Sequence, residues 1–489
     1  MSVRVRFAPS PTGQLHIGNV RTALYSWLWA RQTGGAFVLR IEDTDEKRST
    51  PEAVATVYES LRWLGLDWDE GPEAGGEHGP YLQSERKALY REHAEKLIAE
   101  GAAFRCYATR EEIQALRADY EVRHGKGFRF RSPWRERTDG DPNAPHTVRF
   151  RAPSEGDTGW EDLVYGAVSY PNAEQQDFPL LRPNGLPLYN FGCFVDDLTM
   201  GITLVSRGDD HLVNTPQQLL LYRAWRAIAA GTEPPRFAHL PIVLGPDGKR
   251  FSKRHGAAAV LEYREKGYLP EAVLNYLARL GWSHGDEEIF TRDELVAKFA
   301  WENVGRSPSK YDLKKFEHVQ ATHLREKKSD AELAVLVAPH LAARGVEVAA
   351  EDPRLVAAIA PVKLRATTLP ELAEGLDYFF RPDADLTYEA KGRRKFLTEE
   401  SAPRLAHLAG LVEAAEPFDE PTLESAITAW MEREELAMKH VAQPARVALT
   451  GRTRSPGLYE TLVLLGQARS VARLRRGATL ASEAAEVSG

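Results

Sequence analysis

The sequence has only two cysteines, Cys106 and Cys193, among its 489 residues. They stand far apart, so neither a disulfide framework nor a four-cysteine zinc site can be built from them. No stretch approaches the roughly 20 apolar residues that a membrane-spanning helix requires. The first residues are partly basic but contain no apolar segment of a secretion signal. These absences predict a protein of the reducing cytoplasm without a membrane anchor.

The composition is that of an ordinary globular chain, with no internal repeat or low-complexity segment. Hydrophobic residues make up 43% and charged residues 27% of the positions, which is too polar for a membrane-embedded protein. At roughly 150 residues per domain, the length predicts about three domains. The net charge of −7 argues weakly against a nucleic-acid partner. Basic runs at 123–137, 391–395 and 469–476 leave two interpretations open, a solvated surface or local phosphate contacts.

The first forty residues carry the pattern of a βαβ unit. A short strand is expected over residues 3–8, followed by a turn at 10–13 and a helix over 17–31 with apolar residues at helical spacing. Gly34 and Gly35 end the helix, and an apolar strand follows over 36–41. Such a unit predicts a parallel sheet, covered by helices, whose ligands bind at the carboxyl ends of the strands.

The rest of the chain changes character twice. Residues 105–188 break the pattern with Gly, Pro, Arg and short strand-like runs at 147–151 and 163–168, which indicates an insertion into the nucleotide-binding fold. A strand, a helix and a strand are then expected at 202–206, 216–230 and 242–244. Beyond about residue 270 the pattern is helical, with amphipathic runs at 271–280, 330–338, 354–360 and 423–432. The residues after 476 are predicted to fray.

Two segments have the chemistry of phosphate binding. His16-Ile17-Gly18-Asn19 lies where the first strand turns into its helix, and a helix N-terminus offers unpaired N–H groups to an anion. The segment 245–254 is a glycine-containing loop dense in cations, which could stabilise charge on a triphosphate. Taken singly, the first is equally well an ordinary tight turn and the second a solvated basic loop.

Together the two segments resemble the HIGH and KMSKS signatures of class I aminoacyl-tRNA synthetases. The stretches FAPSPTGQLHIGNVRTAL, LRIEDTD, YLQSER, RGDDHLVNTPQQ and FSKRHGA are similar to the glutamyl branch of that class. The resemblance implies a multidomain fold of α/β plus all-α type, a Rossmann-like catalytic domain with an acceptor-stem-binding insertion, followed by helical stem-contact and anticodon-binding domains. The limits expected on this basis are 1–105 and 189–245 for the two catalytic halves, 106–188 for the insertion, 246–325 for the stem-contact domain and 326–489 for the anticodon-binding domain.

The resemblance also implies an activity. A member of this family activates L-glutamate with ATP and Mg²⁺ to glutamyl-adenylate and transfers it to the 3'-terminal adenosine of tRNA(Glu), as a cytoplasmic monomer. The residues that match the family's ATP site are His16, Gly18, Arg250, Ser252 and Lys253. No protein nucleophile is required, because positioning and electrostatic stabilisation suffice for this chemistry.

Five residues match the family's glutamate site. Arg6 and Arg207 are implied to clamp the side-chain carboxylate, where a guanidinium gives bidentate contacts that an amide cannot satisfy equally. Glu42 is implied to face the α-ammonium group, with Ser10 and Tyr189 as further contacts. Turn formation by Ser10, packing by Tyr189 and a plain surface carboxylate at Glu42 are the alternatives.

Arg365 and Arg446 match positions of the family that contact the anticodon, whose bases are read as single strands. Arg365 resembles the arginine by which discriminating members prefer the glutamate anticodon to the glutamine one, although a solvated helix arginine fits the same pattern. Some members hold zinc in the inserted domain with three cysteines. Here only Cys106 stands near that place and Ala108 occupies the partner position, so no zinc site and no other protein-bound metal is expected.

Three rival interpretations keep parts of this resemblance. A synthetase that also charges tRNA(Gln) differs only at the anticodon, a truncated paralogue that glutamylates a modified base lacks the helical half, and a non-catalytic RNA-binding relative need not keep an ATP site. The last of these is disfavoured by the joint presence of Arg6, His16, Gly18, Glu42, Arg207 and Lys253.

Overall fold

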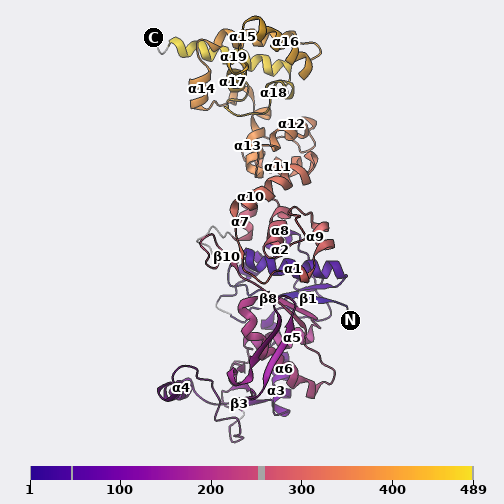
Figure 1. Ribbon diagram of the computed structural model, residues 1–489, viewed down its shortest axis with the longest axis vertical. Helices are drawn as coiled ribbons and strands as arrows, with labels where there is room; N and C mark the ends of the chain where they lie inside the picture. The colour runs from indigo at the N-terminus through magenta and orange to yellow at the C-terminus, as the bar shows by residue number, and fades with distance from the viewer. Residues whose placement is uncertain (1, 46–47, 142, 252–258, 487–489) are drawn as a thin grey trace. The chain divides into compact units, whose positions relative to one another are not determined.

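The structure is a computed structural model that describes residues 2–45, 48–141, 143–251 and 259–486. The chain forms two compact units (Figure 1). The first unit contains Met1–Glu265 and Pro270–Phe316, and the second contains Lys266–Leu269 and Glu317–Gly489. None of the helices within the described ranges is both long and apolar enough to cross a membrane.

A six-stranded sheet forms the centre of the first unit. Its strands follow the order β2-β1-β8-β9-β5-β6, and all neighbours are parallel except β5 and β6, which form an antiparallel hairpin. The strands are β1 (Arg4–Phe7), β2 (Ala36–Leu39), β8 (Leu204–Gly208), β9 (Arg236–Leu240), β5 (Asp157–Asp162) and β6 (Gly166–Pro171). Because the parallel strands point the same way, their carboxyl ends share one edge, where a ligand site is expected.

The βαβ unit expected at the N-terminus is present. Helix α1 (Ile17–Thr33) connects β1 to β2 and packs against both strands and β8. It ends at Gly34, which has a left-handed φ of 64° that favours glycine. The hydroxyl groups of Ser26 on α1 and Ser206 on β8 are 2.5 Å apart, so the helix is also tied to the sheet through a polar contact.

The segment between the halves of the catalytic sheet contributes to two sheets. The run 147–151 is confirmed as β4 (Thr147–Phe150), which pairs with β3 (Ala103–Cys106) and β7 (Pro179–Leu181) in a separate three-stranded sheet. The strand expected over 163–168 is confirmed only in its second half, because 163–165 form the turn of the β5–β6 hairpin and β6 begins at Gly166. The Asp162 carboxylate accepts hydrogen bonds from the backbone N–H groups of Val164 and Tyr165, which fixes this turn.

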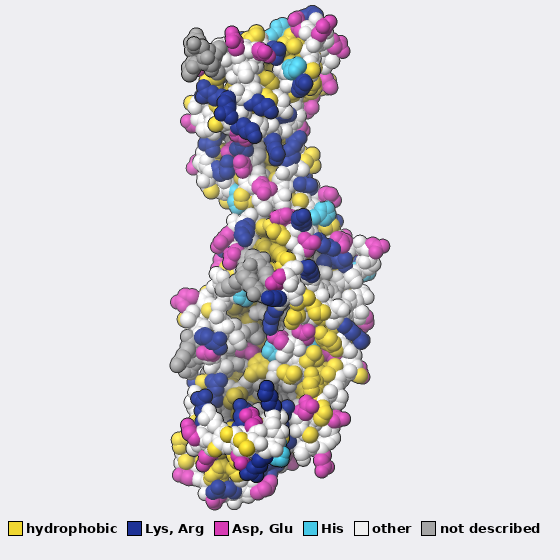
Figure 2. Space-filling model, turned by 60° about the vertical axis from the view of Figure 1, so that its left-hand side comes forward, with side chains coloured by type: hydrophobic (Ala, Val, Ile, Leu, Met, Phe, Trp, Pro, Cys, Tyr) yellow, Lys and Arg dark blue, Asp and Glu magenta, His cyan; other side chains and the backbone are white. Residues whose placement is uncertain are grey.

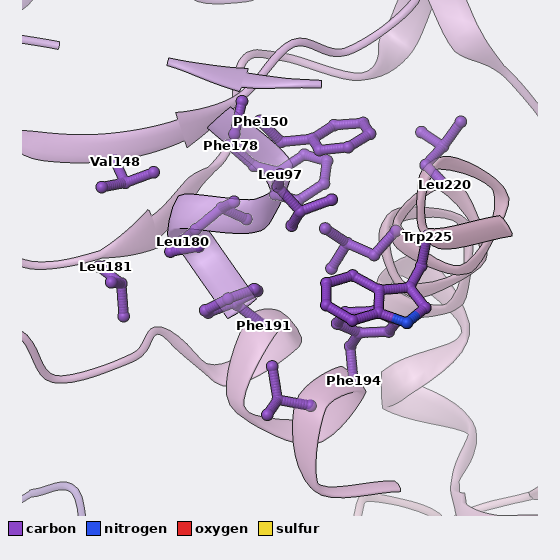
Figure 3. Close-up of a cluster of buried hydrophobic side chains, with 14 of the residues drawn as sticks. Leu97, Val148, Phe150, Phe178, Leu180, Leu181, Phe191, Phe194, Leu220 and Trp225 are labelled. Carbon is purple, nitrogen blue, oxygen red and sulfur yellow. The ribbon is translucent and has the colours of Figure 1, made fainter. Parts of the chain in front are cut away.

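A large apolar core joins the three-stranded sheet to the helices beside the catalytic sheet (Figure 3). It collects Leu97 from α3 (Lys87–Ala99), Phe150 and Leu180 from the sheet, Phe194 from α5 (Tyr189–Thr199) and Trp225 from α6 (Thr215–Ile228). Phe194 and Trp225 meet edge to face with ring centroids 5.9 Å apart. This core fixes α5, the helix that carries several residues to the sheet edge.

The remaining elements are mostly helical, as expected beyond residue 270. In the first part of the chain they are α2 (Pro51–Leu64), α4 (Arg110–His124), β10 (Val243–Leu244), α7 (Val260–Glu265), α8 (Pro270–Arg279), α9 (Arg292–Lys298), β11 (Ser309–Lys310) and α10 (Leu313–Thr322). In the second unit they are α11 (Asp330–Ala342), α12 (Pro353–Lys363), α13 (Leu369–Phe380), α14 (Ala390–Phe396), α15 (Ser401–Ala414), α16 (Glu420–Arg433), α17 (Met438–Thr450), α18 (Leu458–Leu465) and α19 (Gln467–Glu486).

The frayed C-terminal tail predicted after residue 476 is wrong, since α19 continues to Glu486. Although α19 is largely polar in composition, a stripe of residues along it is buried. Leu474 and Ala481 are fully buried, and Gly477 lies so close to Ala448 of α17 that a Cβ there would approach the alanine Cβ to 2.4 Å. Arg473 is buried too, because its guanidinium donates to the Leu449 carbonyl and pairs with Asp383. Packing rather than helical propensity extends this helix.

Candidate active site

A buried group of charges lies at the carboxyl ends of β1 and β2. Asp197 of α5 accepts from two arginines, at 3.2 Å from Arg6 Nε and 2.7 Å from Arg40 Nη1. Burial raises the pKa of Asp197, but the charges of Arg6 and Arg40 outweigh burial and the pKa is lowered. Burial likewise lowers the pKa of Arg6, and Asp197 more than compensates, so that the pKa is raised. Both groups are therefore ionised.

Glu42 lies beside this group of charges and lines a cavity at the same edge of the sheet. Its Oε1 atom lies 3.1 Å from Arg40 Nη2 and 3.4 Å from the Cys193 sulfur. Burial raises the pKa of Glu42, and the charges of Arg40 and Arg6 only partly oppose this. The carboxylate is 7% exposed. Such a group gains from a cationic ligand that replaces the water it has lost.

Arg207, at the end of β8, differs from the other two arginines because its partners are neutral. Its Nε donates to His239 Nε2 at 3.1 Å, its Nη2 donates to the Thr215 hydroxyl at 2.7 Å, and its Nη1 lies 3.4 Å from the hydroxyl of Tyr189. Its side chain is only 5% exposed. Within the residues that the structure describes, no carboxylate forms an ion pair with it. A buried cation of this kind calls for an anionic ligand.

Arg6, Glu42 and Arg207 line a cavity of about 280 Å³. All five residues predicted to bind glutamate are in its lining, which comprises Arg6, Phe7, Ala8, Pro9, Ser10, Thr12, Asn19, Thr22, Glu42, Tyr189, Ser206, Arg207, Gly208 and His211. The buried charges in and behind it are those of Arg6, Arg40, Arg86, Arg207, Glu42, Asp162, Asp196 and Asp197. Among these guanidinium groups, Arg6, Arg40 and Arg86 each pair with a carboxylate and Arg207 does not, within the described residues, so the cavity suits a ligand with an anionic group.

A second cavity, of about 550 Å³, lies at the N-terminus of α1. The predicted residues His16, Gly18 and Arg250 line it, together with Asp210, which lies 3.1 Å from Arg250 Nη2. His16 occupies the N-cap position of the helix, and its side chain makes no capping hydrogen bond there. Free N–H groups and the helix dipole favour an anion at this end. The predicted Ser252 and Lys253 lie outside the described residues.

The two cavities share part of their lining. Asn19, Thr22, Gly208 and His211 face both. Burial and, after it, the positive charge of Arg207 lower the pKa of His211 to about 4. His211 is therefore neutral near pH 7 and adds no charge at the junction. Ligands in the two cavities would meet beside these four residues.

Gly18 offers a way to separate ligand binding from folding. A Cβ at this position would meet no protein atom within 4 Å, and the backbone is helical, so packing does not require glycine. Gly18→Ala is therefore expected to raise the free energy of unfolding by up to about 1 kcal/mol. The same methyl group would project into open space of the larger cavity and raise KM for ATP roughly tenfold. Thermal unfolding and steady-state kinetics would check both effects. An unchanged KM for ATP would contradict the prediction that Gly18 belongs to an ATP site.

The second unit has a cavity of its own, of about 680 Å³, lined by Arg365, Tyr378, Arg452 and Ser455 among others. Arg446 reaches it indirectly, because its Nε donates to the Ser455 hydroxyl at 2.9 Å. Burial lowers the pKa of Arg446, and the positive charge of Arg365 lowers it further. Figure 2 shows Lys and Arg side chains gathered on one face of this unit. The two predicted anticodon residues therefore belong to one basic site.

No group of three His, Cys, Asp or Glu side chains is placed to hold a metal ion within the described part of the chain. Cys106 is buried, with its sulfur 3.2 Å from the Ser132 hydroxyl. It packs with Phe104 and Phe130 in a small apolar cluster.

Sequence reasoning missed Arg40, Asp162, Asp197 and His239, which support the predicted residues from behind. One signal was available for Asp197. It follows Asp196 directly after the apolar run Phe191–Val195 of α5, and two carboxylates in a buried helix require cationic partners. Nothing in the sequence near His239 or Asp162 pointed to Arg207, because the three residues come from different strands.

Comparison with known families agrees with this geometry. Residues 2–318 match the family model of tRNA synthetases class I (E and Q), catalytic domain, and residues 332–478 match that of an anticodon binding domain. A glutamate–tRNA ligase of Anaeromyxobacter sp. (strain K) is 48% identical over 98% of this chain and 99% of its own length. The chain belongs to the glutamate–tRNA ligases of class I.

Further relatives of this ligase support the assignment. The glutamate–tRNA ligase of Geobacter sulfurreducens is 44% identical over 97% of this chain and 98% of its own. The crystal structure of a glutamate tRNA ligase from Elizabethkingia meningosepticum, in complex with its amino acid, has a TM-score of 0.85 at 31% identity and covers 98% of this chain and 99% of that one. The glutamate–tRNA synthetase of Elizabethkingia anophelis has a TM-score of 0.80, also at 31% identity, over 98% of this chain and 100% of that one.

The predicted family, fold class and enzyme class are confirmed by these matches. A class I catalytic domain is followed by a helical anticodon-binding domain, as the resemblance implied. The truncated paralogue is excluded, because the helical half is present and matches the anticodon model over residues 332–478.

Proposed function

We propose that this enzyme activates L-glutamate with ATP in the two adjoining cavities of its first unit and transfers the glutamyl group to the 3'-terminal adenosine of tRNA(Glu). The observation that supports this most strongly is Arg207, a buried guanidinium without a carboxylate partner among the described residues, which lines the smaller cavity. The side-chain carboxylate of glutamate is ionised at neutral pH and would supply the missing counter-charge.

The cavity offers a complementary partner for each charged group of glutamate. The side-chain carboxylate binds Arg207 and Arg6, and the α-ammonium group faces Glu42. Ser10 and Tyr189 provide neutral hydrogen-bonding groups in the same lining. Glutamine would place an amide against Arg207, which leaves the buried cation without its counter-charge. Discrimination against glutamine follows from this cost.

ATP occupies the larger cavity, with its phosphates at the N-terminus of α1. His16, the backbone near Gly18, and Arg250 stabilise the negative charge there, and Ser252 and Lys253 belong to the same proposal by resemblance. The α-carboxylate of glutamate then attacks the α-phosphorus at the junction of the cavities, and pyrophosphate leaves. The protein contributes position and electrostatic stabilisation, without a covalent step of its own.

Mg²⁺ is part of this proposal only as a companion of ATP. The described residues offer no cluster of three metal ligands, and Mg²⁺ commonly binds through substrate phosphates with few protein ligands. When bound, it would neutralise charge on the triphosphate.

We retain the predicted roles and limits of the domains as part of the proposal. Residues 106–188 would bind the acceptor stem, which the separate sheet β3-β4-β7 supports. Residues 246–325 would contact the stem and residues 326–489 the anticodon, with the basic site around Arg365 and Arg446 as support. The enzyme would act as a monomer in the cytoplasm, in keeping with its two free cysteines.

Arg365 would give preference for the glutamate anticodon. It is exposed, and it lines the cavity of the second unit where a base could stack or accept its hydrogen bonds. The experiment is side-by-side charging of purified tRNA(Glu) and tRNA(Gln) with radiolabelled glutamate. The unmodified enzyme is expected to charge tRNA(Glu) alone, and Arg365→Gln to narrow the preference roughly tenfold, as expected for the loss of one base-reading arginine.

Arg354→Gln is the matched control, because Arg354 is an exposed arginine of α12 whose partner is Asp352, two residues before it. It should leave the preference unchanged. Charging of both tRNAs by the unmodified enzyme would make it the non-discriminating kind and remove the role of Arg365. Charging of neither would overturn the proposed activity and favour a non-catalytic RNA-binding protein.

A further inference from the structure

A buried row of polar side chains stands behind Arg207. It runs from Asp162 at the end of β5 through His239 on β9 to Arg207 on β8. Asp162 Oδ2 lies 2.5 Å from His239 Nδ1, and His239 Nε2 lies 3.1 Å from Arg207 Nε. The three residues are 4%, 0% and 5% exposed. The row is isolated from solvent except at its Arg207 end, which reaches the smaller cavity.

The chemistry of the row fixes the direction of each hydrogen bond. An arginine Nε only donates, so His239 Nε2 must accept and cannot carry the proton. The proton then sits on Nδ1 and is donated to Asp162, which as a carboxylate only accepts. Burial lowers the pKa of His239, which keeps the ring neutral. Burial raises the pKa of Asp162, but the hydrogen bond from His239 outweighs this and the pKa is lowered.

The far end of the row is aimed at the ligand cavity. With Nε held by His239 and Nη2 held by the Thr215 hydroxyl, Arg207 has one edge fixed on the protein side. Its Nη1 then lies toward the Tyr189 hydroxyl, and both residues line the smaller cavity. A guanidinium binds a carboxylate best when its planar fork is already oriented, because less freedom is lost on binding.

We propose that Asp162 and His239 are positioning residues for glutamate binding, which set the orientation of Arg207 through the Nδ1-protonated form of His239. This inference rests on the proposed binding of the glutamate side chain by Arg207. The β5–β6 hairpin belongs to the segment between the two halves of the catalytic domain, and β5 pairs with β9 of the catalytic sheet. Through Asp162 this hairpin would contribute to amino-acid specificity. Neither Asp162 nor His239 lines the cavity, so the proposed effect of each passes through the hydrogen bond from Arg207 to His239.

Asp162→Asn is the sharpest test, because the structure determines which way the amide would face. Asp162 Oδ1 accepts from the backbone N–H groups of Val164, Tyr165 and His239 at 3.0, 3.1 and 3.2 Å. The asparagine oxygen must keep that place, so its NH₂ group would face His239 Nδ1. His239 would then have to accept at Nδ1 and carry its proton on Nε2, opposite the N–H of Arg207.

The expected result is a 10- to 100-fold rise in KM for glutamate, roughly the cost of one lost hydrogen bond to a charged group, with KM for ATP changed less than about twofold. Nitrogen-15 NMR of histidine-labelled enzyme should show the proton of His239 move from Nδ1 to Nε2, with the signal assigned by its loss in His239→Gln. A merely structural role would not move the proton between the two nitrogens.

A second substitution tests the relay through His239. In His239→Gln the side-chain oxygen can reach the place of Nε2 and accept from Arg207, so KM for glutamate should stay within about fivefold of normal, whereas His239→Leu, which has no acceptor, should match Asp162→Asn. In the His239→Gln background, adding Asp162→Asn should have little further effect, because coupling between two residues disappears when the link between them is removed. An additive rise would overturn the relay.

Thr158→Val is the matched control for loosening of β5. Thr158 is fully buried on the same strand, and its hydroxyl is bonded to Asn172 at 2.7 Å, away from His239. Equal rises in KM for glutamate in Thr158→Val and Asp162→Asn would overturn the inference. If Arg207→Ala raises this KM and Asp162→Asn does not, the inference fails and the proposed function stands. If Arg207→Ala leaves it unchanged, the proposed role of Arg207 fails, and the inference with it.

Discussion

Arg207→Ala is expected to reduce kcat/KM for glutamate by a factor of roughly 30 to 4,000, which corresponds to the 2 to 5 kcal/mol that truncation of a buried charge partner costs. The effect should be large because the bound carboxylate would lose its only partner that is not already neutralised by the protein. Arg6 shares its charge with Asp197, whereas Arg207 has neutral partners within the described residues. Steady-state aminoacylation at varied glutamate would measure it.

Three comparisons make this result specific. KM for ATP should be nearly unchanged, since Arg207 lines the smaller cavity and not the larger one. Arg207→Lys keeps the charge but loses the planar fork, so its kcat/KM for glutamate should lie between that of the unmodified enzyme and that of Arg207→Ala. The preference for glutamate over glutamine should shrink by a similar factor, because an amide never used the ion pair. A folded Arg207→Ala enzyme with normal kinetics for glutamate would show that the side-chain carboxylate binds elsewhere.

Arg40→Met is expected to lower the free energy of unfolding of the first unit by about 3 to 5 kcal/mol, the usual cost of breaking a buried ion pair. Arg40 is fully buried and lies 2.7 Å from Asp197, 3.1 Å from Glu42 and 3.6 Å from Asp196. Methionine fills much of the same volume but leaves these carboxylates short of a counter-charge. Nine of the ten tryptophans lie before residue 317, so urea unfolding followed by tryptophan fluorescence reports mainly on this unit.

The pH dependence of this variant distinguishes lost charge from lost packing. Without Arg40, the buried carboxylates should have pKa values above those of the unfolded chain, so they take up protons on folding as the pH falls. The stability difference from the unmodified enzyme should therefore narrow between pH 7.5 and 5.5. Arg123→Met is the control, because Arg123 pairs with Asp119 on the surface, and such pairs contribute at most about 1 kcal/mol. A pH-independent difference would indicate lost packing instead.

The parts of the fold that could be predicted from sequence are those decided by neighbouring residues. The apolar spacing of α1 and the glycines behind it determine the βαβ unit, and both are visible within forty residues. The strand expected at 163–168 is shortened by a local turn that its apolar pattern did not reveal, whereas α19 depended on distant contacts. Asp162 turns the chain after β5, and the buried stripe of α19 is stabilised by α17 and Asp383.

In the candidate site, too, some residues could be predicted from the nearby sequence and others could not. Arg6, Glu42 and Arg207 could be named because they stand within stretches that resemble a known family. Their supporting residues could not, since Asp197 lies 191 positions from Arg6 along the chain and His239 lies 77 positions from Asp162. The strand order β2-β1-β8-β9-β5 brings Arg207, His239 and Asp162 together, and helix α5 places Asp197 beside Arg6. A motif identifies the groups that touch a ligand, but the groups that orient them depend on topology.

The strand order also has a consequence for the growing chain on the ribosome. Strand β1 pairs at once with β2, but its other edge waits for β8, whose first residue is Leu204. At typical rates of 5 to 20 residues per second, nearly 200 residues of synthesis take roughly 10 to 40 seconds. Through that interval β1 presents an unpaired edge, the kind of surface on which strands from other chains assemble. We therefore expect the nascent residues 1–203 to need protection from such assembly until β8 has been made.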